Sequence, residues 1–172
     1  MYTSSSITTK SDQENEVLAR RFHMEIFQKG MLGVADEILT PGFILRNPVL
    51  PPEFTYGPEG VKKFASSVAN RSVGFEIVHH DAISTADKVL IRWTYTGTLK
   101  KDLLGIPPSD KLVTITGFDL FRITKHGKIA ELWQTPTYYQ RWEVVIVPFV
   151  LMPSHTKYET STPEPSVVSR NY

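Results

Sequence analysis

KVLIRWTYTGTL at residues 88–99 and LVTITGFDLFRIT at residues 112–124 are the most regular stretches of this 172-residue chain. Along both, apolar side chains recur at nearly every second position, which is the period of a β-strand with one buried face. The same alternation recurs in two further segments, residues 75–83 and 128–135. Short turn sequences join neighbouring segments at Ala86-Asp87 and His126-Gly127. The second half of the chain therefore predicts an antiparallel sheet.

Helical periodicity precedes the sheet. Ser11 and Glu14 form a capping box, and the apolar residues that follow recur every three or four positions until Gly30. A short amphipathic segment, a short strand and a further helix follow at residues 32–39, 43–47 and 57–68. Helices that precede an antiparallel sheet are the order of an α+β domain.

The folded domain is expected to span residues 11–147. Residues 1–10 are rich in Ser and Thr and carry no periodic pattern, so they predict a disordered N-terminus. After about Val147 the periodic patterns stop, and Pro, Ser and Thr are frequent in residues 148–172. This composition predicts an extended or disordered C-terminal tail.

Composition argues against several classes of protein. The chain carries 19 basic and 18 acidic residues without a basic stripe, which argues against nucleic-acid binding. No apolar run approaches the length of a membrane span. The absence of cysteine excludes a disulfide framework, a thiol nucleophile and a thiolate zinc site. Together with the lack of a signal-peptide segment, it favours a cytoplasmic protein.

Three groups of residues resemble the motifs of one family. They are the strand VLIRWTYTGT (89–98), the loop LGIPP (104–108) and the hairpin TGFDLFRI…GKIAELW (116–133). In this order they are similar to motifs of the SnoaL-like polyketide cyclases, within the nuclear-transport-factor-2-like superfamily, over about residues 17–141. The resemblance implies a strongly curved antiparallel sheet wrapped around the N-terminal helices, with a conical pocket open at one end.

The function implied by the resemblance is broader than the fold. Family members include cyclases that close carbon rings by aldol chemistry, isomerases, hydrolases and proteins without catalysis. They usually need no metal or cofactor, and dimers are common. For this chain the resemblance implies a homodimer without a cofactor and a small, apolar substrate that carries oxygen functions.

The chain departs from the family at positions that often carry acid–base groups. Relatives often have aspartates just after the last tryptophan, where this chain has Gln134 and Thr137. Many have a histidine after the Gly-Thr strand end, where this chain has Leu99. The usual acid–base group is therefore missing or moved, which counts against aldol cyclisation in particular.

Asp119 is the first candidate for a catalytic group, because its strand pattern places it on the apolar face. A carboxylate among apolar neighbours is costly to bury, and burial shifts its pKa toward values suited to acid–base work. If His126-Gly127 is a two-residue turn, Asp119 faces Gln134 and Arg122 faces Glu131. The alternatives are a structural, hydrogen-bonded Asp119 or a bulge that exposes it.

His79 is the second catalytic candidate. Phe75 and Ile77 place His79, and not His80, on the more apolar face of its strand. Histidine titrates near neutral pH and can take up or release a proton. A surface position or a satisfied structural role is the alternative. The remaining histidines show no metal-ligand spacing with this pair, so no metal site is predicted: His23, His126 and His155.

Six further side chains are expected to contact substrate: Asn47, Trp93, Tyr95, Trp133, Gln134 and Tyr138. Trp93 and Tyr95 share the apolar face of their strand, and a tyrosine hydroxyl can hold a developing oxyanion. Asn47 precedes a proline, as a polar residue often does in the family, and its amide can orient a carbonyl. Trp133 resembles the family's tryptophan, and Tyr138 lies near the second missing aspartate. Core packing or a turn is the alternative for these residues.

Three functions remain open. The favoured one is a cofactor-independent cyclase or isomerase that acts by general acid–base catalysis on a polyketide- or terpenoid-like intermediate of specialised metabolism. The second is a non-catalytic small-molecule-binding or assembly module, which the missing aspartates favour. The third is an epoxide hydrolase or hydratase. Relatives of that kind use an arginine between two carboxylates, whereas Asp119 and Arg122 face opposite sides of their strand.

Overall fold

The computed structural model describes residues 10–103 and 106–139. Lys10 is the first helical residue, although the composition predicts disorder up to that position. The remaining nine residues of the predicted disordered N-terminus lie outside the described residues, as do the predicted tail and the end of the predicted domain after residue 139. No helix in the described part of the chain is long and apolar enough to cross a membrane.

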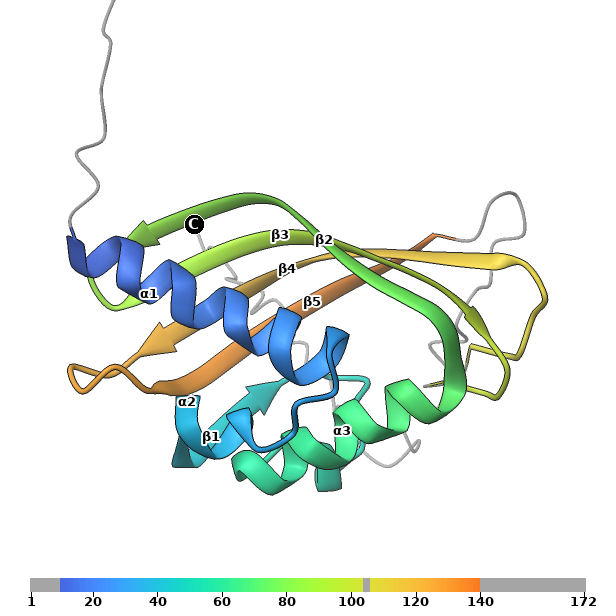
Figure 1. Cartoon of the computed structure of the whole chain (residues 1–172), viewed down its shortest axis with the longest axis horizontal. Helices are drawn as coiled ribbons and strands as arrows, with labels where there is room; N and C mark the ends of the chain where they lie inside the picture. The colour runs from blue at the N-terminus through green and yellow to red at the C-terminus, as the bar shows by residue number, and fades with distance from the viewer. Residues whose placement is uncertain (1–9, 104–105, 140–172) are drawn as a thin grey trace, which may run out of the picture.

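Helices precede a five-stranded sheet, as the α+β order predicts (Figure 1). The helices are α1 (Lys10–Arg21), the π-helix η1 (Phe22–Gln28), α2 (Val34–Ile38), the 3-10 helix η2 (Pro52–Phe54) and α3 (Gly57–Arg71). The strands are β1 (Leu39–Arg46), β2 (Ser72–Thr85), β3 (Lys88–Leu99), β4 (Leu112–Ile123) and β5 (Ile129–Tyr139).

The sheet has the strand order β1-β5-β4-β3-β2. Strands β2 to β5 form an antiparallel meander in which Asp119 lies opposite Gln134 and Arg122 opposite Glu131, the expected register. The predicted two-residue turn is wrong, because Thr124 pairs with Lys128 across three residues, and a register irregularity between Arg122 and Ile123 offsets the extra residue. Strand β1, in contrast, pairs with β5 in parallel, so the expected antiparallel sheet has one parallel edge. Alternation within a strand shows which side chains share a face but not which distant strand lies beside it.

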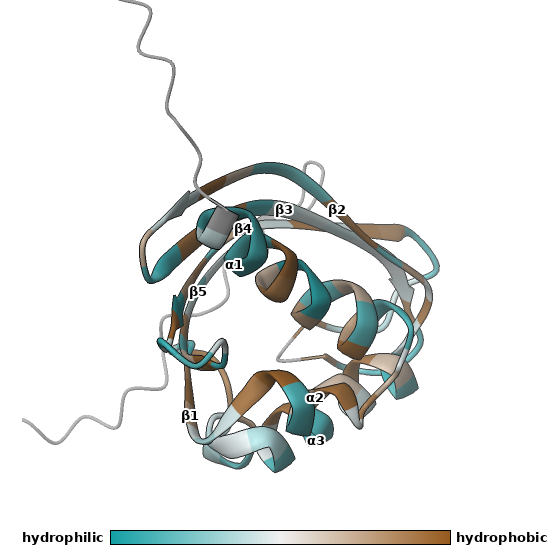
Figure 2. Cartoon of the chain, turned by 60° about the vertical axis from the view of Figure 1, so that its left-hand side comes forward, coloured by the Kyte–Doolittle hydropathy of each residue, from teal (hydrophilic) through white to brown (hydrophobic). Residues whose placement is uncertain are grey.

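The long strands bend over helix α1, and α2, α3 and β1 lie across α1 from strands β2 and β3 (Figures 1 and 2). Strand β2 has two register irregularities, one after Val73 and one after His79, and such bulges bend a strand and increase its twist. The concave face carries the apolar residues of the alternating pattern, and these pack on the helices into one buried core. The curved sheet therefore wraps around the helical layer, as the resemblance implies.

The second half of the first helix is a π-helix, where the periodicity predicts a regular α-helix up to Gly30. The Lys29 N–H donates to the Met24 carbonyl, five residues back, at 3.1 Å. In this wider winding, residues five apart lie on one side of the helix, and the Phe22 and Phe27 rings are 5.3 Å apart. Phe22, His23 and Phe27 all face the interior as a result.

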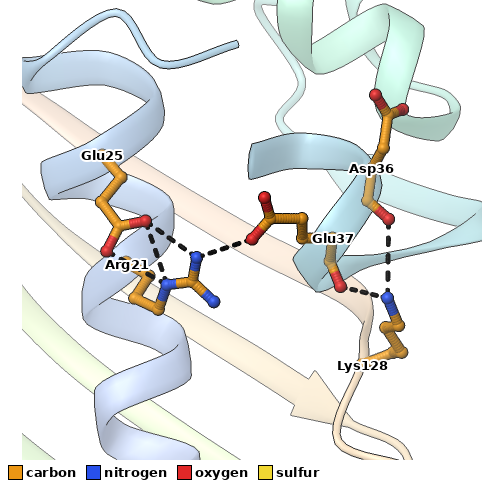
Figure 3. Close-up of polar contacts among 5 residues, drawn as sticks. All are labelled: Arg21, Glu25, Asp36, Glu37 and Lys128. Atoms are coloured by element: carbon orange, nitrogen blue, oxygen red, sulfur yellow. Dashed lines mark hydrogen bonds and ion pairs between the residues drawn. The ribbon is translucent and has the colours of Figure 1, made fainter. Parts of the chain in front are cut away.

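Polar contacts on the outer side of this helix fix its rotation (Figure 3). Arg21 forms ion pairs with Glu25, at 2.9 Å, and with Glu37 of α2, at 3.0 Å. Lys128, in the hairpin between β4 and β5, donates to the backbone carbonyls of Asp36 and Glu37. Residues two apart on a helix do not share a side, so anchoring Arg21 and Glu25 outward turns the residue between them, at position 23, toward the sheet.

Candidate active site

A pocket lies between the concave face of the sheet and the helices. Its empty space, counted together with the solvent at its open mouth, is about 680 Å³. Most of the lining is apolar, and six of its side chains, here called the apolar wall, are Phe27, Phe64, Val68, Phe75, Leu103 and Ile106. Four others form the polar corner: His23, Asn47, Trp93 and Gln134.

Asp119 lies beneath the polar corner and is fully buried, at 0% exposure. Its Oδ1 accepts a hydrogen bond from Trp93 Nε1 at 2.8 Å. Its Oδ2 accepts from His23 Nε2 at 2.8 Å and from Gln134 Nε2 at 3.2 Å. Three N–H donors offset the cost of burying a carboxylate. The strand pattern is therefore right about the face of Asp119, but the side chain lies behind the pocket surface and does not line it.

Gly117 makes the Trp93 contact possible. The two residues lie opposite each other in the β3–β4 pairing. A Cβ atom on Gly117 would lie 2.5 Å from Cζ2 of the Trp93 indole, well inside contact distance. The missing side chain lets the indole lie against the β4 backbone, from which its N–H reaches Asp119, two residues further along the same strand.

His23 joins the polar corner to a second histidine. Its ring is 4% exposed and lines the pocket, and its Nδ1 lies 2.9 Å from Nε2 of His79. From the sequence, His23 is weighed only as a possible metal ligand, and its place in the pocket is not predicted. A signal was present, because His23 follows Ala19 by four positions and precedes Ile26 by three, and both are fully buried.

His79 faces inward and His80 is exposed, as the strand pattern predicts. His79 does not line the pocket, however, since it lies behind His23. Its Nδ1 accepts a hydrogen bond from Nη1 of Arg20 at 3.0 Å. Burial, with the charges of His23 and Arg20 adding to it, lowers the pKa of His79 from 6.5 to about 4. The ring is therefore neutral at neutral pH.

A chain of amides forms the other side of the polar corner. The Val49 N–H donates to Oδ1 of Asn47 at 3.1 Å, so the Asn47 amide nitrogen is turned away from it. That nitrogen donates to Oε1 of Gln134 at 2.8 Å, and the Gln134 nitrogen in turn donates to Asp119. A single backbone N–H thereby sets the direction of both amides toward the carboxylate.

Tyr95 lines the pocket beside Phe75, with ring centroids 4.8 Å apart. Its hydroxyl is buried and forms no hydrogen bond of good geometry within residues 10–103 and 106–139. Burial raises the pKa of Tyr95, while the nearby Ser72 acts in the opposite direction. The phenol therefore keeps its proton at neutral pH.

The last two residues expected to contact substrate are Trp133 and Tyr138. Trp133 is 53% exposed on the outer face of the sheet, where the Arg46 guanidinium lies 5.3 Å from its ring centroid. The prediction that Trp133 contacts substrate in the pocket is therefore wrong, because its neighbour Gln134 takes the inward position on β5. The Tyr138 backbone pairs with Ile115, but its side chain lies outside the described structure.

The chemistry that this arrangement supports is proton transfer. A buried carboxylate and an imidazole lie at the edge of an apolar pocket, where acid–base groups act with little competition from water. Amide N–H groups beside them can hold negative charge on a ligand oxygen. Among the described residues, no three potential ligands gather as a metal site would require.

The comparison with protein families gives one match. A model of the SnoaL-like polyketide cyclase family matches residues 17–140. No curated protein sequence matches the chain.

Solved structures share the fold at low sequence identity. TsrD of Streptomyces laurentii is 23% identical with a TM-score of 0.62, and the match covers 72% of this chain and 88% of TsrD. IdmH of Streptomyces antibioticus, a proposed polyketide cyclase, is 22% identical with a TM-score of 0.57, covering 72% of this chain and 91% of IdmH. A SnoaL-like polyketide cyclase of Agrobacterium tumefaciens strain C58 is 10% identical with a TM-score of 0.61 and covers the same shares, 72% and 91%.

Proposed function

Because the chain belongs to the SnoaL-like polyketide cyclase family, we propose that it cyclises or isomerises a small, apolar, oxygen-bearing molecule by general acid–base catalysis, without a cofactor. A polyketide- or terpenoid-like intermediate of specialised metabolism has this chemistry. The observation that carries the proposal is the hydrogen bond between His23 and Asp119, both buried, at the one polar corner of an apolar pocket.

The reaction begins at Oδ2 of Asp119. The Gln134 contact to this oxygen is the longest of the three, at 3.2 Å, and Gln134 belongs to the pocket surface. A substrate that displaces this amide brings a C–H bond, next to a carbonyl, toward Oδ2. The proton passes to the carboxylate, and the C–H electron pair forms an enolate. His23 and Trp93 remain as donors that hold the carboxyl group in place.

The enolate oxygen needs hydrogen-bond donors at the pocket surface. The displaced Gln134 amide and the Asn47 amide are available there. The enolate carbon then forms a bond to a second carbonyl carbon, whose oxygen receives the π electron pair and takes the proton from Asp119, or a different carbon takes the proton back from Asp119. The first course is a cyclisation and the second an isomerisation, and in both the mass of the substrate is unchanged.

The hydrolase alternative has less support from the pocket. Arg122 lies on the outer face of the sheet, where it pairs with Glu131 at 3.2 Å. Within the described residues, no arginine lines the pocket beside Asp119. The non-catalytic alternative uses the same pocket for binding alone, and the experiment below separates it from catalysis.

The test compares metabolites in cells that carry only Asp119→Asn, only Asp81→Asn, or the unchanged protein. Asp81 is the matched control, since it is an exposed carboxylate on β2 that pairs with Arg92. With equal protein levels, we expect Asp119→Asn to lose a product and to accumulate a species of identical mass. A general acid–base group contributes about a hundred- to ten-thousand-fold, so the loss should be nearly complete.

Other outcomes would contradict the proposal in distinct ways. A mass difference of one water between the lost and the accumulated species would indicate a hydrolase or hydratase. An unchanged profile with folded Asp119→Asn protein would indicate a binding module. Loss of the product with Asp81→Asn as well would show that the effect is not specific to the pocket.

The homodimer that the resemblance implies remains a prediction. Phe118 and Trp133 are 48% and 53% exposed on the strands β4 and β5. A second copy that covered these side chains would remove apolar surface from water. Light scattering on the purified protein, over a range of concentrations, measures whether the mass is that of one chain or two.

A further inference from the structure

A chain of hydrogen bonds leads from Asp119 to the protein surface. Oδ2 of Asp119 lies 2.8 Å from Nε2 of His23, and Nδ1 of His23 lies 2.9 Å from Nε2 of His79. Nδ1 of His79 lies 3.0 Å from Nη1 of Arg20. Arg20 is about one third exposed and pairs with Glu16 at 2.8 Å. The buried carboxylate and the solvent are thus joined by two imidazole rings and a guanidinium.

The chemistry of arginine sets the direction of this chain. A guanidinium has only donors, so Nδ1 of His79 must accept and the proton of this neutral ring is on Nε2. That N–H donates to Nδ1 of His23, whose own proton is therefore also on Nε2. The His23 N–H then donates to Asp119, which accepts as a carboxylate. Every group in the chain has a partner of the required kind.

We propose that Arg20 is a positioning residue that fixes this direction and thereby closes the proton route between Asp119 and solvent. The inference rests on the proposed function, since it concerns the proton that Asp119 takes from the substrate. To leave through this chain, that proton would have to reverse both histidines and end on Arg20. Arg20 has no lone pair to accept it.

A closed route has a consequence for the reaction. The proton that leaves one carbon of the substrate stays on Asp119 and returns to the same molecule. A cyclisation or isomerisation can use this return, because neither reaction has a net gain or loss of a proton. Arg20 lies on α1 and lines no part of the pocket, so its effect acts only through His79 and His23.

The charged and titratable groups around His79 belong to four elements. Arg20 and Glu16 lie on α1, His23 lies on η1 and connects to Asp119 of β4, and His80 is the next residue on β2. Burial and the three basic neighbours lower the pKa of His79 to about 4. The neutral ring that the chain requires is therefore stable from about pH 5 upward.

The direction of the chain can be measured on the free protein, without substrate. Nitrogen NMR of protein labelled in its histidines reports which ring nitrogen carries the proton. The proposal predicts the Nε2–H form for both His23 and His79 at pH 7, with N–H protons that exchange slowly with water. The variants His23→Gln and His79→Gln assign the two sets of signals. A proton on Nδ1 of either ring in the unchanged protein would overturn the proposal.

Three arginine variants test whether Arg20 sets the tautomers of the two histidines. Lysine at this position is also only a donor, so Arg20→Lys should keep both tautomers. A glutamine can accept as well as donate, so Arg20→Gln should mix the tautomers. N–H exchange should become faster by about tenfold or more, because the variant loses one hydrogen bond to a charged group. Arg92→Gln is the control, since Arg92 pairs with Asp81 on the exposed side of the sheet. If Arg20→Gln leaves tautomers and exchange unchanged, the proposal is wrong.

The two proposals fail in different ways. If Asp119→Asn leaves the metabolites unchanged while the NMR result holds, the chain is structural and the proposed function is wrong. If Asp119→Asn abolishes the product while the tautomers do not depend on position 20, catalysis stands and the closed route is wrong. The histidine signals themselves are read on the free protein and do not depend on catalysis.

Discussion

The polar corner and the apolar wall of the pocket are built in different ways. In the polar corner each side chain has a named partner at 2.8–3.2 Å, and its contacts depend on one another through Asp119. The apolar wall has aromatic and aliphatic side chains that pack without a fixed direction, such as Phe27 against Phe64 at 5.3 Å. A directional site can hold a reacting atom, whereas an apolar surface mainly selects shape and size.

The two regions also come from different parts of the chain. The polar corner and Asp119 draw on the middle of the long strands, where register is fixed on both sides, on one residue of the π-helix, and on Asn47 just after β1. Much of the apolar wall comes from α3 and from the connection after β3. Chemistry and substrate choice can therefore be changed separately, and the predictions below use this difference.

The largest expected effect separates the two regions by one substitution in each. His23→Leu removes an N–H donor that holds the Asp119 carboxylate in place, so turnover should fall by about tenfold to a hundredfold. Phe75→Leu removes only apolar contact and should weaken substrate binding by about tenfold or less, with turnover largely kept. Steady-state kinetics on the accumulating species measure both. Equal losses of turnover in the two variants would contradict the division.

The next effect concerns how the strands hold the polar corner. Gly117→Ala places a methyl group against the Trp93 indole, so we expect a loss of about 2–3 kcal/mol in the free energy of unfolding. Gly33→Ala is the control, because a Cβ there meets nothing within 4 Å, and it should change stability by less than about 0.5 kcal/mol. Urea denaturation measures both. A Gly117→Ala protein of unchanged stability would show that the indole does not need this space.

A smaller effect depends on pH. The unfolded His79 takes up a proton near pH 6.5 and the folded one only near pH 4, so unfolding takes up a proton in this range. The free energy of unfolding should fall as the pH is lowered from 6.5 to 4, by about 1–2 kcal/mol once the partial exposure of the ring is allowed for. His79→Gln should reduce this slope and His80→Gln should keep it. Denaturation at several pH values provides the comparison.

The smallest effect is expected outside the pocket. Trp133→Ser removes an exposed ring and its contact with Arg46, which is worth about 0.5–1 kcal/mol at an exposed site. Turnover should not change, in contrast to Trp93→Phe, which removes a donor from Asp119. Kinetic measurements on both variants show whether the two tryptophans differ as their positions require.

Much of the sheet could be predicted from the sequence. Alternation gave the bounds of β3, and the expected register, with Asp119 opposite Gln134, is found although the turn has three residues, because a register irregularity after Arg122 offsets the extra one. Alternation is a local property, since the side-chain period depends on neighbouring residues, whereas the longer turn and the irregularity that offsets it were not predicted. The same alternation predicts that Asp119 faces inward, which the full burial of this side chain confirms.

Other features depended on contacts that no local pattern contains. The parallel pairing of β1 joins residues far apart in the chain. Helical spacing can indicate that His23 faces inward but not that it contacts His79, and Asp119 lies beneath the pocket because Trp93, His23 and Gln134 cover it. The error at Trp133 was avoidable, since adjacent residues of a strand cannot both face one pocket.

The most direct measurement returns the accumulating species to the purified protein. We would isolate the compound that builds up with Asp119→Asn and incubate it with the unchanged protein and with that variant. The account predicts that the unchanged protein converts it to an isomer of identical mass, and that Asp119→Asn leaves it unconverted but still bound in the pocket. Conversion by both proteins at the same rate would contradict the claim that Asp119 transfers the proton.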